Sequence, residues 1–257
     1  MGRRDQILRI LQDTGFQSVA SLAKRFHVNV STIRRDLDWL SEHGKIQRTH
    51  GGALPAMDDS DDDIPIAHLR EKRAIGPAMA ERLLEGQTVF IDTGSTCLEV
   101  AKALQHRNLT AVTHDLLVGM EILKKPSLNL VFIGGDLLPM KTHMWGPVAV
   151  DQLDRIRVNV AVFGASSVME NGVYGNSSYN LELLRKIRSI ASEAFFVADS
   201  TKFGREALYK VLGLESFTAG ITDALMDPLK AASYPIPLIR APFPLRNDGK
   251  DSPENEK

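Results

Sequence analysis

The strongest constraint on the fold comes from the sequence after Leu69, where short apolar runs alternate with segments of helical spacing. The apolar runs predict strands at residues 88–92, 110–113, 128–134, 158–164, 194–199 and 218–222. Helices are predicted at residues 70–84, after Thr96, and from Tyr179 to Ala191. Strands that are apolar throughout and separated by helices are typical of a mostly parallel sheet covered on both faces. The sequence therefore predicts an α/β domain over residues 69–243.

Most of these predicted strands end in small or polar residues, and in a parallel sheet such ends form one ligand-binding edge. Gly94 allows close approach of the backbone, and the helix start that follows it offers N–H groups to a phosphate. Lys202 supplies a cation, and Asp199 or Asp92 can accept sugar hydroxyls. The alternative is that the small residues only make turns. The residues predicted to bind an effector are Asp92, Thr93, Gly94, Ser95, Thr96, Thr113, His114, Gly134, Gly135, Gly164, Asp199 and Lys202.

The first 55 residues contain three short segments of helical spacing. The first lies near the N-terminus, and the second fits residues 19–26. After a tight connection, Ser31 is predicted to cap a third helix that buries Ile33, Leu37 and Leu40. Three short helices with such a turn before the third are typical of a helix-turn-helix.

The third helix and the segment after it carry the residues predicted to contact DNA. The N-terminal part of a recognition helix meets base edges in the major groove, and arginine can bond guanine bidentately. Residues 45–50 alternate like a strand before Gly51-Gly52, which predicts a β-wing against the DNA backbone or minor groove. A protein-interaction module with solvated arginines is the alternative. The predicted DNA contacts are Ser31, Thr32, Arg34 and Arg35 on the helix, and Arg48 and His50 on the wing.

The distribution of charge along the chain separates parts with different partners. The formal net charge is only −1, but residues 1–55 hold nine basic and five acidic residues, an excess of four positive charges. Asp36 and Asp38 are expected to point away from phosphate or to pair with neighbouring basic groups. Residues 58–63 are aspartate apart from Ser60, so the sign changes sharply. We therefore predict a winged helix-turn-helix over 1–56, a linker over 57–68 and a disordered tail over 244–257.

Three features argue against other classes of protein. The single cysteine, Cys97, excludes an internal disulfide framework and is expected to be a buried small residue rather than a nucleophile. The seven histidines show no metal-ligand spacing, so neither a metal site nor a cofactor is predicted. No apolar run approaches the ~20 residues that span a bilayer, and the N-terminal segment does not read as a signal peptide. We expect a cytoplasmic protein without a membrane partner.

Motifs in both halves resemble the DeoR-type repressors of sugar catabolic operons. The N-terminal motifs are Ser31-Thr32-Ile33-Arg34-Arg35-Asp36-Leu37 and Arg48-Thr49-His50-Gly51-Gly52-Ala53. The C-terminal motifs are Ile91-Asp92-Thr93-Gly94-Ser95-Thr96, Val112-Thr113, Ile133-Gly134-Gly135, Gly164-Ala165-Ser166 and Ala198-Asp199-Ser200-Thr201-Lys202-Phe203-Gly204. The resemblance runs from about residue 3 to Asp223. It implies operator binding, a fold similar to ribose-5-phosphate isomerase, and a phosphorylated sugar or polyol as effector.

Two parts of the sequence depart from the family pattern. His114 stands where members of the family commonly carry Asn, and the segment Lys141-Thr142-His143-Met144-Trp145 does not align with the pattern. Both could touch the part of the effector that is not phosphate. Met140, Met144 and Trp145 could cover the pocket, pack in the core or contact another subunit.

Three hypotheses about function follow. The preferred one is a repressor of a sugar or polyol operon that works as a homodimer or homotetramer joined through the second domain, reads double-stranded operator DNA, and releases it when the effector binds. The second is a sugar-phosphate isomerase with a DNA-binding head, using Asp92, Glu182, Asp199 and Lys202. The third is a DNA-binding protein without sequence preference.

Overall fold

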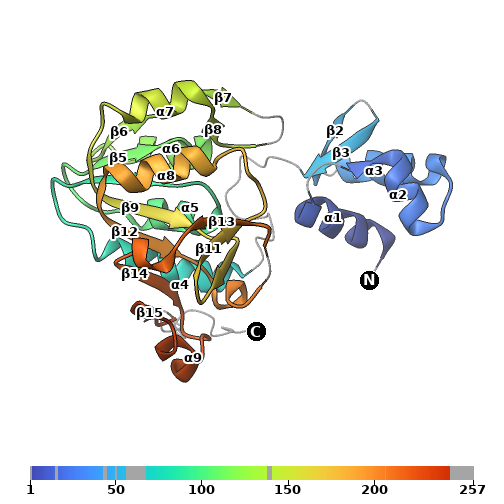
Figure 1. Ribbon diagram of the computed structural model, residues 1–257. Helices are drawn as coiled ribbons and strands as arrows, with labels where there is room; N and C mark the ends of the chain where they lie inside the picture. The colour runs from blue at the N-terminus through green and yellow to red at the C-terminus, as the bar shows by residue number, and fades with distance from the viewer. Residues whose placement is uncertain are drawn as a thin grey trace, which may run out of the picture. The chain divides into compact units, whose positions relative to one another are not determined.

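The computed structural model of the chain forms two compact units, Met1–Pro65 and Ile66–Lys257, which we call the N-terminal unit and the C-terminal unit (Figure 1). The structure describes residues 2–14, 17–42, 45–49, 51–55, 68–137, 141–205 and 207–243. The predicted tail over 244–257 and residues 57–67 of the predicted linker lie outside the described residues.

The N-terminal unit is a winged helix-turn-helix, as predicted. Its sheet has the order β1-β3-β2, and Gly51 turns the wing with a φ of 92° that favours glycine. Strand β1 was not predicted, because two residues are too short to show a period. The elements are α1 (Arg3–Thr14), β1 (Gln17–Ser18), α2 (Val19–Phe26), α3 (Val30–Glu42), β2 (Ile46–Thr49) and β3 (Gly52–Pro55).

Local capping fixes the turn between the second and third helices. The Ser18 side chain accepts a hydrogen bond from the Ser21 N–H at 3.0 Å at the start of α2, and His27 ends α2 in the left-handed conformation with a φ of 53°. Ile33, Leu37 and Leu40 are buried as predicted, in a core that they share with α1 and α2. The predicted cap at Ser31 is wrong, since α3 begins at Val30 and the Asn29 carbonyl already accepts from the Ile33 N–H.

The C-terminal unit is built on a parallel sheet, as predicted. In its described residues seven strands run in the order β15-β14-β12-β9-β4-β5-β6, and all the neighbouring pairs are parallel. The strands are β4 (Thr88–Ile91), β5 (Thr110–Thr113), β6 (Asn129–Phe132), β9 (Val158–Gly164), β12 (Ala191–Val197), β14 (Ala219–Asp223) and β15 (Leu238–Ala241).

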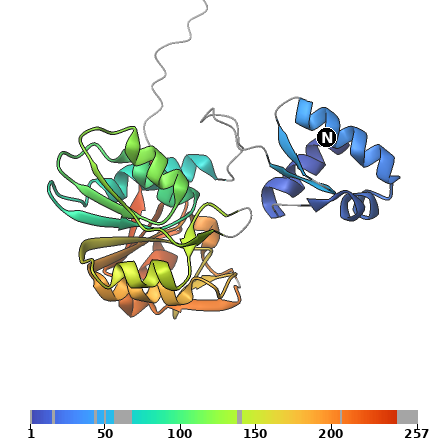
Figure 2. The same cartoon turned by 90° about the horizontal axis from the view of Figure 1, so that it is seen from above.

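Helices cover both faces of this sheet (Figures 1 and 2). Alternate side chains of a strand enter different cores: Phe90 packs on the side of α7 and α8, whereas Val89 and Ile91 pack on the side of α4, α5 and α6. Burying each such side chain stabilises the fold by about 1.5–3 kcal/mol. The helices are α4 (Leu69–Ala80), α5 (Ser95–Ala103), α6 (Leu116–Leu123), α7 (Pro147–Leu153), α8 (Leu181–Ile190) and α9 (Pro228–Ala232).

The structure corrects several predicted boundaries and adds elements. The helix expected over 70–84 ends at Ala80, the helix expected from Tyr179 begins at Leu181, and the strand expected over 128–134 is only β6. Strand β12 begins three residues before the predicted 194–199, because Ala191 already pairs with Val158. Strand β15 and helix α7 were missed. So were a small antiparallel sheet of β10 (Ser167–Met169), β11 (Gly172–Gly175) and β13 (Tyr209–Leu212), and the pair β7 (Asp136–Leu137) and β8 (Met144–Trp145).

Two expectations from the sequence concern Cys97 and membranes. Cys97 is fully buried in α5, and burial, followed by the charges of Asp92 and Asp115, raises the pKa of its thiol well above the ordinary value. The prediction of a buried small residue is confirmed. In the described residues no helix has both the length and the apolar character needed to cross a membrane.

Candidate functional site

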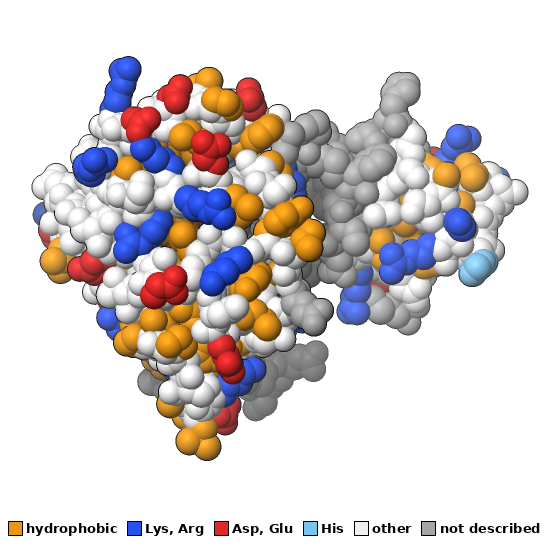
Figure 3. All heavy atoms as spheres, in the orientation of Figure 1, with side chains coloured by type: hydrophobic (Ala, Val, Ile, Leu, Met, Phe, Trp, Pro, Cys, Tyr) orange, Lys and Arg blue, Asp and Glu red, His pale blue; other side chains and the backbone are white. Residues whose placement is uncertain are grey.

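The recognition helix α3 presents polar and basic side chains on the face opposite its buried residues. Ser31, Arg34 and Arg35 are exposed, and Thr32 is half-buried. The visible face of the N-terminal unit carries lysine and arginine side chains and scarcely any acidic ones (Figure 3). The side chain of Arg48, on β2, and all of His50 lie outside what the structure describes.

Asp36 is turned away from this face, as expected. Its buried carboxylate accepts hydrogen bonds from Arg3 Nε at 2.6 Å and Arg4 Nε at 3.0 Å. Burial by itself would raise the pKa of Asp36, but the hydrogen bonds and charges of the two arginines outweigh it and lower the pKa. The Arg4 guanidinium also lies 4.4 Å from the ring centre of Trp39. These contacts join α1 to α3, and the two arginines balance the negative charge of Asp36 on the recognition helix.

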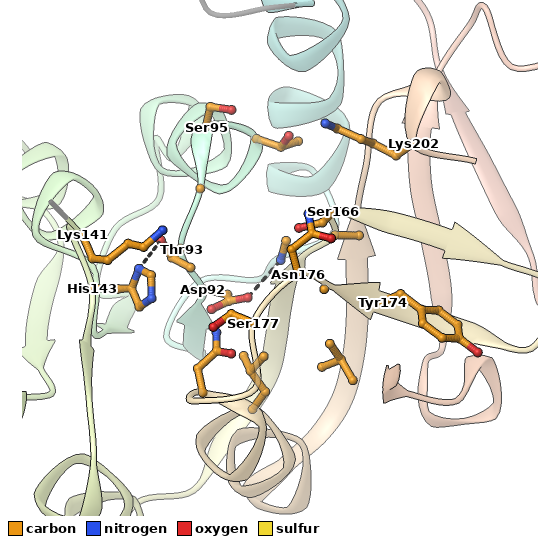
Figure 4. Close-up of a pocket in the computed structure, with 18 of the residues that line it drawn as sticks. Asp92, Thr93, Ser95, Lys141, His143, Ser166, Tyr174, Asn176, Ser177 and Lys202 are labelled. Atoms are coloured by element: carbon orange, nitrogen blue, oxygen red, sulfur yellow. Dashed lines mark hydrogen bonds between the residues drawn. The ribbon is translucent and has the colours of Figure 1, made fainter. Parts of the chain in front are cut away.

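A cavity of about 560 Å³ opens at the carboxyl ends of β4 and β9 in the C-terminal unit (Figure 4). Figure 4 shows Lys141 and Lys202 extending into it from opposite sides. Seven of the residues predicted to bind an effector line this cavity: Asp92, Thr93, Gly94, Ser95, Thr96, Gly164 and Lys202.

The turn from β4 into α5 forms a polar end of the cavity. Gly94 caps α5 with a φ of 107°, a conformation that other residues rarely adopt, and no atom lies within 4 Å of the position a Cβ would take. The backbone at the start of α5 is therefore open to a ligand, with the hydroxyls of Ser95 and Thr96 beside it. Backbone N–H groups at a helix start favour an anion.

Two lysines belong to this end of the cavity. Lys202 follows β12, in a short 3-10 turn (Ser200–Lys202) that Asp199 caps by accepting from the Thr201 N–H at 3.2 Å. Lys72, on α4, is buried. Burial lowers the pKa of Lys72 and the charge of Lys202 lowers it further, whereas the charge of Asp199 opposes both. Lys72 and Lys202 both line the cavity, so two cations are available there to an anion.

Asp92 lies at the end of β4 in a buried ion pair with His114. Its Oδ1 lies 3.0 Å from His114 Nε2, and its Oδ2 accepts from the Gly164 N–H at 3.2 Å. The other ring nitrogen of His114, Nδ1, lies 2.7 Å from the Met144 carbonyl oxygen. Because a carboxylate and a carbonyl can only accept, the hydrogen-bond network assigns a proton to both nitrogens. Burial lowers the pKa of His114, but the hydrogen bond and charge of Asp92 outweigh it, and the pKa is raised.

His143 stands at another end of the cavity, between two segments that are distant in the sequence. Its Nδ1 lies 3.2 Å from the Thr93 hydroxyl, and its Nε2 lies 3.1 Å from the Tyr179 hydroxyl. The rings of His143 and Tyr179 stack with centres 5.9 Å apart, and Trp145 meets Tyr179 edge-on at 5.6 Å. Burial, followed by the charge of His114, lowers the pKa of His143.

Five residues of the predicted set do not line the cavity. His114 and Asp199 are fully buried behind Asp92 and Lys202, and they orient the residues that do. Thr113 is buried and donates to the Ile91 carbonyl at 2.8 Å. Gly134 donates its N–H to Gln152 Oε1 at 3.1 Å, and a Cβ on Gly135 would lie 2.4 Å from the Trp145 carbonyl oxygen. Gly135 therefore allows close packing against β8 and α7, whereas Gly134 contributes its N–H.

Several residues of the cavity were not predicted from the sequence. Lys72 comes from a helix rather than a strand end, and nothing in the sequence pattern marked it. Lys141 and His143 belong to the segment from Lys141 to Trp145, which was expected from the sequence to be able to touch the part of the effector that is not phosphate, and both line the cavity. The polar run from Gly175 to Asn180 could have been read as a binding loop, because it follows an apolar strand. The unpredicted lining residues are Lys72, Lys141, His143, Ala165, Ser166, Tyr174, Gly175, Asn176, Ser177, Tyr179, Asn180, Leu184 and Val211.

Comparison with known proteins finds matches along most of the chain. Residues 3–57 match the DeoR-like helix-turn-helix domain, and residues 67–224 match the DeoR C terminal sensor domain. The transcriptional repressor AccR of Agrobacterium fabrum is 31% identical over 86% of this chain and 89% of its own length. The glycerol-3-phosphate regulon repressor of Escherichia coli is 31% identical over 86% and 90%. Ribose 5-phosphate isomerase A from Methanocaldococcus jannaschii matches 51% of this chain and 53% of that chain, with a TM-score of 0.38 and 16% identity.

Proposed function

The chain belongs to the DeoR family of DNA-binding transcription regulators, and from that premise we propose that it represses a sugar or polyol catabolic operon under the control of a phosphorylated effector. Its relatives are named as repressors, and the chain is a regulator rather than an enzyme. The proposal goes further in two respects: it assigns a phosphorylated sugar or polyol to the cavity, and operator DNA to α3 and the wing.

The observation that carries the proposal is that Lys72 and Lys202 both line the cavity together with the open start of α5. Two cations, a helix start and the hydroxyls of Ser95 and Thr96 are the groups that hold a phosphate in other proteins. Asp92, whose carboxylate bonds to His114 behind the cavity, supplies an acceptor for hydroxyls. With Lys72 and Lys202 both in its lining, the cavity offers a phosphate two cations, so the arrangement favours a phosphorylated ligand over its parent sugar.

DNA recognition is assigned to α3. Ser31, Arg34 and Arg35 are exposed while Ile33 and Leu37 are held in the core, so the helix presents one fixed face. Such helices read half-sites about 34–36 Å apart in dimers. We therefore place the protein on DNA as a homodimer or homotetramer, and we expect the effector to favour a conformation that no longer fits two half-sites.

A ligand screen followed by DNA binding tests this function. Thermal shifts are measured for the full chain with phosphorylated sugars and polyols, each beside its unphosphorylated parent. A ligand at ~100 times its Kd stabilises the fold by ~2.7 kcal/mol. We expect a shift with a phosphorylated compound alone, and loss of that shift in Lys202→Gln. A shift with the unphosphorylated parent alone would contradict the assignment of phosphate.

The DNA half is tested separately with duplexes selected by the protein from a random pool. Fluorescence anisotropy of selected and scrambled duplexes measures discrimination, and the effector is then added. Arg35→Ala is expected to lower the discrimination by ~1–3 kcal/mol, because a base contact is lost. Equal affinity of the native protein for both duplexes would instead support a DNA binder without sequence preference.

A further inference from the structure

One end of the cavity is closed by a hydrogen-bonded wall made from segments far apart in the sequence. It consists of Thr93, which follows β4, His143, which precedes β8, and Tyr179, which precedes α8. We call these three residues the distal wall, because Thr93 and His143 lie on the side of the cavity opposite Lys202 (Figure 4). The proposed phosphate site does not use this wall.

Asp115 sets the direction of the hydrogen bonds in the distal wall. Its buried carboxylate accepts from the N–H groups of Leu117 at 2.9 Å and Val118 at 3.0 Å. It also accepts from the hydroxyls of Thr93 and Thr142, each at 2.6 Å. A carboxylate that accepts four hydrogen bonds has no proton to give. The Thr93 proton therefore points at Asp115, and the Thr93 oxygen remains an acceptor.

The direction of the Thr93 hydrogen bond also determines the direction of the hydrogen bond between His143 and Tyr179. Since the Thr93 hydroxyl already donates its hydrogen bond to Asp115, His143 Nδ1 must donate to the Thr93 oxygen. Burial and the charge of His114, whose ring centre lies 5.5 Å from that of His143, lower the pKa of His143 and favour a neutral ring, so Nε2 accepts. The Tyr179 hydroxyl consequently donates to Nε2 at 3.1 Å, and the stacking of the two rings holds it in that direction.

Tyr179 therefore offers oxygen lone pairs to the cavity rather than a proton. Burial raises the pKa of Tyr179 and a hydrogen bond from the Ser177 side chain opposes this, so Ser177 uses one lone pair and the other is left for a ligand. The Asp92 carboxylate, also in the lining, is a second acceptor, since its two oxygens are held by donors behind the cavity and keep further lone pairs. Two acceptors attract ligand hydroxyls, which donate, and repel a carboxylate, which cannot. Lys141 lines the same end and would favour an acid, but it is exposed, so solvent and salt screen its charge.

We infer that Tyr179, held by His143, selects an effector with hydroxyl groups at the end remote from its phosphate, so that the matching sugar-acid phosphate is rejected. The inference rests on the proposed function for its phosphate and adds the chemistry of the opposite end. Tyr179 is a specificity-determining residue in this account, and His143 is a positioning residue that acts through it.

Isothermal titration calorimetry on the full chain tests the inference with matched probes. Sorbitol 6-phosphate is compared with 6-phosphogluconate, and glycerol 3-phosphate with 3-phosphoglycerate, since each pair differs by a carboxylate in place of a hydroxyl-bearing carbon. We expect the hydroxyl member of at least one pair to bind about tenfold more tightly. Tyr179→Phe should reduce that preference by about fivefold while leaving the affinity for inorganic phosphate unchanged.

Two matched variants keep the test specific. Tyr174→Phe removes the hydroxyl of another tyrosine in the lining, one that donates to Asn171 Oδ1 at 3.1 Å, and it should leave the preference intact. Lys141→Gln removes the competing cation and should leave the preference intact or increase it. Loss of the preference in Tyr174→Phe would point to general disturbance of the cavity rather than to Tyr179.

The possible failures can be told apart. Equal or tighter binding of the carboxylate member by the native protein, or an unchanged preference in Tyr179→Phe, overturns the inference and leaves the proposed function standing. Binding of sorbitol without any binding of phosphorylated probes overturns the phosphate assignment. The affinities for sorbitol and gluconate are then compared to test the distal wall. Absence of binding by every probe overturns both.

Discussion

At the scale of single residues, two buried carboxylates are neutralised by bases that the sequence places far away. Asp36 pairs with Arg3 and Arg4, which lie more than thirty positions earlier. Asp92 pairs with His114, which lies 22 positions later. Arg3 and Arg4 hold the Asp36 carboxylate away from the exposed face of α3. His114 holds the Asp92 carboxylate at the wall of the cavity. A protonatable histidine behind Asp92 makes the C-terminal unit sensitive to pH.

His114→Asn should weaken and flatten the pH dependence of stability. A folded-state pKa raised above the unfolded value gives stability that is fully present below about pH 6.5 and is lost as pH rises through the folded pKa. The native protein should therefore exceed the variant by about 1.5–3 kcal/mol near pH 6, with the difference shrinking as pH increases. Urea unfolding of both proteins at a series of pH values measures it. A difference that grows with pH would contradict the raised pKa.

At the scale of elements, the cavity depends on the packing of α4 against α5. Helix α4 carries Lys72, and α5 begins at the proposed phosphate site. The two helices touch backbone to backbone, since a Cβ on Gly76 would lie 2.4 Å from the Glu99 carbonyl oxygen. No side chain fits between them there, so this contact sets how far Lys72 lies from the start of α5.

Gly76→Ala should separate the two helices and weaken both stability and anion binding. Overpacking of this kind costs about 1–3 kcal/mol. The matched control is Gly134→Ala in the same unit, where an added Cβ would make only an ordinary contact of 3.6 Å with Gln152. Thermal unfolding with and without inorganic phosphate compares them. Equal behaviour of the two variants would show that the close contact does not position the site.

At the scale of the whole molecule, the proposed function requires a signal to pass from the cavity to the DNA-binding unit. Lys72 lies in the first turn of α4, which is the first described helix after the segment that joins the two units. An anion held by Lys72 and Lys202 would contact both α4 and the region after β12. We therefore expect α4 to respond directly to the effector, while Lys202 mainly contributes affinity.

Lys72→Met should uncouple effector binding from DNA release. With effector at a saturating concentration, the native protein should lose operator affinity, by roughly 5–150-fold if the coupling is of typical size. Lys72→Met should bind the operator normally without effector and lose most of that change, whereas Lys202→Gln should regain it at higher effector concentration. Anisotropy titrations with and without effector measure all three proteins. A full response by Lys72→Met at saturation would show that the signal takes another route.

The sequence by itself determined the architecture and about a third of the residues that line the cavity, seven of twenty. Apolar periodicity and glycine at strand ends are local signals, so they located β4, β5 and β9 closely and predicted Asp92 to Thr96, Gly164 and Lys202. The helical spacing of Ile33, Leu37 and Leu40 likewise predicted which face of α3 is exposed.

Only the tertiary structure decided which polar residues face the ligand and which support them from behind. In the sequence, His114 and Asp199 resemble the polar strand-end residues that line the cavity. In the folded sheet, both residues are fully buried instead. The distal wall joins Thr93, His143 and Tyr179, separated by 50 and 36 positions. No periodic pattern records such a contact, because the folded topology alone brings these segments together and the direction of their hydrogen bonds depends on Asp115 at a fourth position.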